Sequence, residues 1–128
     1  MIGISGSGNI DVAADASEVE LDISGSGDIK LKTYTQKLSG NISGSGDIFL
    51  IGESTGSAWY NTSGSGNIKT FDFESKYCSV RTAGSGNAKV FATETLDVEI
   101  AGSGDVYYKG NPEIDVNIAG SGNVISAN

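Results

Sequence analysis

Asparagine or aspartate follows each of the seven Gly-Ser-Gly tripeptides of the chain, at intervals of 18 to 20 residues. The positions are Asn9, Asp28, Asp47, Asn67, Asn87, Asp105 and Asn123. Carboxylate and carbonyl oxygens that recur after glycine pairs are typical of the calcium sites in some β-rolls. Asp28 and Asp47 are the one pair of successive aspartates, so they are the candidate calcium ligands. The favoured interpretation is simpler, because Asn and Asp side chains commonly bond to the backbone at turns.

A serine stands at the centre of every tripeptide, but the composition offers no means of activating it as a nucleophile. The chain has no histidine, which removes the commonest general base and the commonest metal ligand. The 16 acidic residues include no pair that the sequence holds close enough for glycosidase chemistry. We therefore expect no catalytic residue and a non-enzymatic protein, with a polysaccharide-active enzyme as a remote alternative.

Several aromatic residues are expected to point outward from the predicted strands. These candidate ligand-binding residues are Trp59, Phe49, Phe71, Phe91 and Tyr107. Exposed aromatic side chains can form platforms for sugars or for protein partners, so a glycan or a surface protein is the expected partner. The alternative is that they pack under variable loops or against a second chain. The lysines of one outward column, Lys30, Lys69 and Lys89, are interpreted as a solvated face that prevents aggregation.

The elements that position these residues follow from the alternation of apolar and polar side chains around each tripeptide. Around the second tripeptide, for example, the apolar residues are Leu21, Ile23, Ile29 and Leu31. A period of two predicts β-strands, and glycine permits a sharp corner between them. The seven repeats share one register, which predicts one domain over residues 1–128: an all-β, right-handed parallel β-helix of about seven coils. An antiparallel sandwich or barrel is the alternative, and the absence of Asn-Gly and Asp-Gly turns disfavours it.

Charge and composition exclude several classes of partner. The net charge of −8 argues against nucleic acid and anionic membrane surfaces, and no apolar run is long enough for membrane insertion. The one cysteine, Cys78, falls on an inward column and is expected to be a buried, inert thiol. The apolar N-terminal segment 1–4 is expected to leave an open strand edge. This edge would pair with a missing segment, a second chain or another copy, whereas the C-terminal residues 125–128 are expected to form a modest polar cap.

The repeated pattern resembles that of a known bacterial family. Apolar-x-Ile-(Ser/Ala)-Gly-Ser-Gly-(Asp/Asn)-(Ile/Val)-x-apolar, together with the segment from Asp105 to Pro112, is similar to the putative auto-transporter adhesin, head GIN domain family. The resemblance covers essentially the whole chain and implies a right-handed β-helix in a secreted or cell-envelope protein of bacteria. It also implies an adhesion, ligand-binding or scaffold role and supplies no catalytic residues. Family members usually continue further at the N-terminus, where they carry an export signal.

Overall fold

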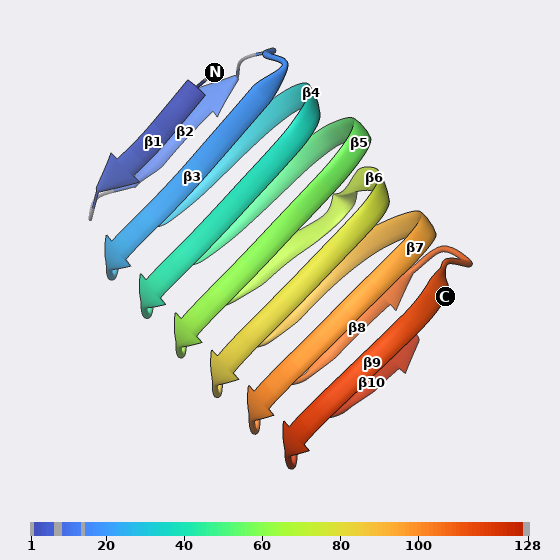
Figure 1. The fold of residues 1–128 in the computed structure, drawn as a ribbon. Helices are drawn as coiled ribbons and strands as arrows, with labels where there is room; N and C mark the ends of the chain where they lie inside the picture. Colours follow the sequence, from blue (N-terminus) through green and yellow to red (C-terminus); the bar gives the residue numbers. More distant parts are fainter. Residues whose placement is uncertain (1, 7–8, 14, 127–128) are drawn as a thin grey trace.

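The chain forms one continuous parallel β-sheet that winds into a solenoid (Figure 1). The computed structural model describes residues 2–6, 9–13 and 15–126, and these contain strands but no helix. The strands are β1 (Ile2–Gly6), β2 (Ile10–Ala13), β3 (Glu18–Gly25), β4 (Asp28–Gly44), β5 (Asp47–Gly64), β6 (Ile68–Gly84), β7 (Ala88–Gly102), β8 (Val106–Lys109), β9 (Glu113–Gly120) and β10 (Val124–Ser126). No helix that could span a membrane occurs in this described part of the chain.

Each long strand from β4 to β7 makes nearly one whole turn between two successive tripeptides. In Figure 1 the near strands run to the lower left and the far strands return to the upper right. The chain meanwhile advances toward the lower right, so the coil is right-handed. The predicted parallel β-helix is thereby confirmed, and the alternative of an antiparallel sandwich or barrel is wrong. The seven tripeptides enclose about six turns, because a turn lies between two motifs.

Glycine is required at both ends of the third to seventh tripeptides, for two different reasons. The first glycine adopts a positive φ, as at Gly44 with 122°, which side chains with a Cβ rarely tolerate. The second glycine has no such φ, but a Cβ on Gly46 would overlap the carbonyl oxygen of Gly27 in the preceding coil. The same Cβ would lie 2.6 Å from Cγ2 of Ile23. Stacked corners therefore approach so closely that only glycine fits.

The core is a set of ladders made by inward residues on both sides of the corner. Before the corner the chain buries Leu21 and Ile23, and after it Ile29 and Leu31, all at 2% exposure or less. Equivalent positions in successive coils pair in register, as Ile29 does with Ile48. Full burial of one such side chain contributes roughly 1.5–3 kcal/mol, so each coil depends on its neighbours for stability.

The corner opposite the tripeptides absorbs the variation in coil length. Between β5 and β6, Phe49 pairs with Lys69 and Ile51 with Asp72, so β6 contains an additional residue there. Between β6 and β7 the pairing is interrupted between Lys69 and Glu74. This irregularity, which we call the β6 bulge (residues 70–73), appears as a kink in Figure 1.

The two ends of the solenoid expose strand edges that pair on one side only. β1 pairs with β3, and at the other end β9 pairs with β7. The side chains of the N-terminal segment lie outside the described residues. At the C-terminal end, β9 exposes Ile114, Val116 and Ile118 by 37%, 40% and 39%. The expected polar cap lies partly outside the described residues, which end at residue 126, and within them Ile125 is 38% exposed.

Candidate functional site

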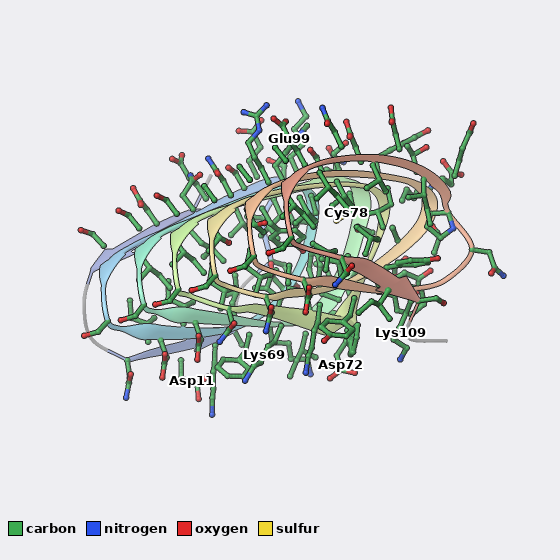
Figure 2. The ribbon with its side chains drawn as sticks, turned by 90° about the horizontal axis from the view of Figure 1, so that it is seen from below. Asp11, Lys69, Asp72, Cys78, Glu99 and Lys109 are labelled. Atoms are coloured by element: carbon green, nitrogen blue, oxygen red, sulfur yellow. The ribbon has the colours of Figure 1, made fainter. Side chains whose placement is uncertain are left out.

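The five predicted ligand-binding aromatics do not form one site, because they lie on opposite sides of the corner. Trp59 belongs to the half of β5 before a tripeptide, whereas Phe49 belongs to the half after one. The corner folds these halves against each other, so their outward side chains point in opposite directions. Figure 2 shows this arrangement, with Glu99 on the upper face and Lys69 and Lys109 on the lower face.

The first of these surfaces, which we call the tryptophan face, is built on the halves of β4, β5 and β6 that precede a tripeptide. Its outward residues are Ser39, Asn41, Trp59, Asn61, Ser79 and Arg81. Trp59 is 46% exposed and lies in register between Ser39 and Ser79, whose small side chains leave its ring accessible. Trp59 was predicted from the sequence as a ligand-binding residue, but nothing in the sequence singled out these polar neighbours as part of the same site.

Two hollows flank the Trp59 ring. One has a volume of about 360 Å³ and is lined by polar side chains that include Asn41, Asn61 and Arg81. The other has a volume of about 260 Å³ and includes Glu18 and Glu20. An aromatic ring between hydrogen-bonding groups can hold a ligand that has both an apolar face and hydroxyl groups.

Arg81 supplies a positive charge to the tryptophan face, and it forms an ion pair with Glu99. Its guanidinium lies 3.1 Å from the Glu99 carboxylate, and both side chains are more than half exposed. An exposed pair of this kind contributes at most about 1 kcal/mol, so a ligand can compete for the arginine at small cost.

The opposite surface carries the other four predicted aromatics together with lysines. We call it the lysine–aromatic face, and its residues are Lys30, Phe49, Lys69, Phe71, Lys89, Phe91, Tyr107 and Lys109. Lys69 Nζ lies 4.8 Å from the centre of the Phe49 ring, and Lys109 Nζ lies 5.6 Å from the centres of the Phe71 and Phe91 rings. Lys30, Lys69 and Lys89 are interpreted from the sequence as a solvated face, although Phe49 stands in the same column and contacts both Lys30 and Lys69.

The asparagine and aspartate ladder bonds to the backbone of the following coil. The amide of Asp47 donates to Oδ1 of Asp28 at 3.2 Å, and the amide of Asn67 donates to Oδ1 of Asp47 at 3.0 Å. The same bond joins Asn87, Asp105 and Asn123 to the preceding coil. The described residues contain no group of three or more His, Cys, Asp or Glu that could hold a metal ion. A calcium site at Asp28 and Asp47 stays a prediction, and it would use the second oxygen of each carboxylate.

Neither Cys78 nor the one Gly-x-Ser-x-Gly segment has the surroundings of a catalytic nucleophile. Cys78 is 3% exposed, and burial raises the pKa of its thiol to about 12, partly offset by a hydrogen bond with Ser75. The Gly-x-Ser-x-Gly pattern of serine hydrolases occurs once, at residues 52–56. Its backbone lies within β5 beside β6, whereas the hydrolase motif requires a strand-to-helix turn and a histidine partner.

Comparisons with known proteins agree on the family and the fold. The family described as putative auto-transporter adhesin, head GIN domain, matches residues 1–112. The crystal structure of a putative adhesin from Bacteroides fragilis superposes with a TM-score of 0.82 at 28% identity, over 98% of this chain and 60% of that one. A putative lipid binding protein from Parabacteroides distasonis superposes with a TM-score of 0.66 at 29% identity, over 98% and 61%. The chain therefore spans about three-fifths of either neighbour. No curated protein matches the sequence.

Proposed function

The chain belongs to the putative auto-transporter adhesin, head GIN domain family. We propose that it is a non-enzymatic binding module that is either secreted or located at the bacterial cell surface. Its ligand is a glycan, bound on the tryptophan face. The neighbours are described as an adhesin and as a lipid binding protein, and both descriptions fit a binding role.

The observation that carries this proposal is the half-exposed Trp59 ring between two hollows. A pyranose ring has an apolar face of C–H groups, which packs on the indole, and hydroxyl groups at its edge. Asn41, Asn61 and Arg81 are placed to hydrogen-bond such hydroxyls. The platform is rigid because β5 is paired on both sides along this segment, so little conformational entropy is lost on binding.

The test is binding to an array of bacterial-envelope and host glycans, followed by calorimetry on the best ligand. Trp59→Ala is expected to weaken binding by tenfold or more, as loss of a central aromatic anchor costs about 2 kcal/mol. Tyr34→Ala is the matched control, because Tyr34 is 54% exposed but lies at the opposite corner. The proposal would be overturned if the parent protein bound no glycan on the array. It would also be overturned if the Trp59→Ala variant and the parent bound the ligand with equal affinity.

A second candidate function is structural, with copies that associate through the ends of the solenoid. The apolar edge of β9 favours it, since Ile114, Val116 and Ile118 are exposed beside unpaired strand backbone. The sequence directed attention to the N-terminal edge alone, and the structure adds the C-terminal edge as its counterpart.

Polysaccharide cleavage has one observation in its favour, the two carboxylates of Glu18 and Glu20 in a hollow beside Trp59. Both side chains are exposed to solvent, whereas a glycosidase acid is held in an apolar pocket. We therefore expect no release of reducing ends when the protein is incubated with the glycan that it binds. Release that is lost in Glu18→Gln or Glu20→Gln would instead assign an enzyme.

A further inference from the structure

Positive charge is concentrated on one face of an acidic protein. The chain has a net charge of −8 and eight basic residues, and this side of the solenoid carries five of these: the four lysines of the lysine–aromatic face and Lys32, which pairs with Ile51. Asp11, which pairs with Lys30, and Asp72 are carboxylates on the same side. The opposite face exposes carboxylates before the corner, at Glu20, Asp22, Asp97 and Glu99. The two sheet halves are about 10 Å apart, and the outward side chains of each half add to this separation. A ligand on the lysine–aromatic face therefore lies more than about 10 Å from the carboxylates of the acidic face.

The four lysines of this face contact aromatic rings and form no ion pair among the described residues. Lys30 and Lys69 lie on either side of Phe49, 5.8 and 4.8 Å from the ring centre. Lys89 and Lys109 lie 6.0 and 5.6 Å from the centre of the Phe71 ring. Cation–π contacts fix the ammonium groups without neutralising them, so their charge remains available to an anion.

A hollow of about 260 Å³ lies between the two ring clusters. Its lining includes Phe49, Ile51, Lys69, Phe71, Asp72 and Lys89. Ile51 is 52% exposed, which makes it one of the most exposed large apolar residues of the described chain. The β6 bulge places Phe71 and Asp72 beside β5, where the regular repeat has one residue fewer. The hollow therefore combines an apolar wall with two lysines, and Asp72 is the one carboxylate in its lining.

Cations and rings follow each other along the solenoid axis. One outward column contains Lys30, Phe49, Lys69, Lys89 and Tyr107 in successive coils. Neighbouring coils are about 4.8 Å apart, which is close to the length of one sugar residue in a linear polysaccharide. We propose that this face binds a linear acidic polysaccharide, with its carboxylate or sulfate groups on the lysines and its C–H surfaces in the hollow.

Polysaccharide fits this face better than a nucleic acid does. Bases bind single-strand readers by stacking on open ring faces, but here lysine ammonium groups lie over the rings. The net charge of −8 opposes every polyanion alike, so the choice between them rests on the contacts of this face and not on charge density. An acidic polysaccharide needs only separated cations and apolar edges, which this face provides.

The inference rests on the proposed function only in that both treat the chain as a binding module. Its test uses oligomers of polygalacturonate and, as the neutral match, the same oligomers fully methyl-esterified. The expected result is that the parent binds the acidic oligomer at least tenfold more tightly than the ester. Binding should weaken when salt rises from about 0.15 to about 1 M, which shortens the Debye length from about 8 to about 3 Å.

Charge reversal on the face gives the decisive comparison. Lys89→Glu is expected to weaken polygalacturonate binding about tenfold, and Lys69→Glu serves as a second variant in case one folds poorly. Lys76→Glu is the control, since Lys76 is exposed but lies at the corner, away from the hollow. Trp59→Ala should leave this binding unchanged, so loss of one site is distinguishable from loss of the other.

Three outcomes would overturn the assignment. The first is an absence of binding to polygalacturonate, and the second is equal loss in the Lys76 and Lys89 variants. The third is that a single-stranded oligonucleotide or phosphatidylglycerol vesicles bind as tightly as the oligomer and are released by Lys89→Glu. That result would show that the face binds any polyanion and has no preference for an acidic polysaccharide.

Discussion

At the residue scale, burial determines the chemistry of Cys78. Its thiol is enclosed by the core, and burial raises its pKa to about 12 from an ordinary value of 9.0. Since the thiolate is the reactive form, we expect no reaction with a disulfide reagent at neutral pH until the protein unfolds. Time-resolved labelling with and without urea measures this, and rapid labelling of the native protein would contradict the placement of Cys78.

The same burial makes the free energy of unfolding depend on alkaline pH. The unfolded thiol loses its proton near pH 9.0, whereas the folded thiol keeps it up to about pH 12. Stability is therefore full below about pH 9 and falls as the pH rises through this window. The buried Tyr60 hydroxyl, whose pKa burial also raises, contributes in the same direction. Urea titrations should show a smaller decline in Cys78→Ala, and an unchanged decline would contradict the prediction.

Two buried threonines with different partners offer a matched pair of substitutions. Thr62 is 1% exposed and its hydroxyl has no hydrogen-bond partner among the described residues, whereas the Thr70 hydroxyl donates to the Lys89 carbonyl at 2.7 Å. Thr62→Val should raise the free energy of unfolding by about 1 kcal/mol, because an unsatisfied polar group is removed. Thr70→Val should lower it by about 1 kcal/mol. Chemical denaturation measures both, and equal signs would contradict this account.

Only some of the candidate site residues could be predicted from the sequence, because contacts between side chains of neighbouring coils depend on how their strands pair in register. Trp59 and Phe49 are outward by the alternation rule, and their places before and after a tripeptide assign them to different sheet halves, but neither fact says which side chains contact each other. The contact between Lys109 and Phe71 depends on the β6 bulge, where the pairing is interrupted. A single sequence with a repeat of variable length does not locate such a bulge, so the lysine–aromatic face emerged only from the structure.

At the element scale, the tripeptide corner is the most constrained part of each coil. A Cβ on Gly66 would overlap the Gly46 carbonyl oxygen and lie 2.6 Å from Cγ2 of Ile42. Gly66→Ala should therefore lower the free energy of unfolding by about 2–3 kcal/mol, as overpacking commonly does.

Gly40 provides the control for this substitution within a strand. A Cβ there would meet Ile48 and Tyr60 side-chain atoms at 3.4 Å, which is ordinary contact. Gly40→Ala should change stability by less than about 1 kcal/mol, with a favourable part from the reduced freedom of the unfolded chain. Thermal unfolding of the two variants checks the contrast, and similar midpoints would refute the steric explanation.

The elements themselves were well predicted because one physical pattern recurs in every coil. Alternating apolar residues fixed the inward columns, and all of Leu21, Ile23, Ile29 and Leu31 are buried. The opposite corner was not predicted, since coils of 18 to 20 residues turn there through bulges of different kinds. Residue spacing alone carries no signal for such bulges.

At the scale of the whole molecule, we expect the open strand edges to govern association. β9 presents unpaired backbone together with the exposed Val116, which is a template for strand addition by another copy. We expect the 128-residue chain to associate in a concentration-dependent manner in analytical ultracentrifugation.

A lysine on this edge should prevent such association. Val116→Lys is expected to shift the protein to the monomer, because a charged side chain on a strand edge disfavours further pairing. Ile51→Lys is the matched control, since Ile51 is 52% exposed but lies on a side face. A parent protein that is monomeric at every concentration would eliminate end-to-end association.

The ladder of side-chain oxygens has the same polarity along the whole described solenoid. Oδ1 of Asp28 receives the amide of Asp47, and Oδ1 of Asp47 receives that of Asn67. Each completed coil thus presents a side-chain oxygen that can accept a hydrogen bond from the backbone amide of the next coil. Nascent chain leaving the ribosome or a secretion pore N-terminus first would meet each template in the order in which it is made. Vectorial export and folding would then proceed as one process, with no coil waiting for a distant part of the chain.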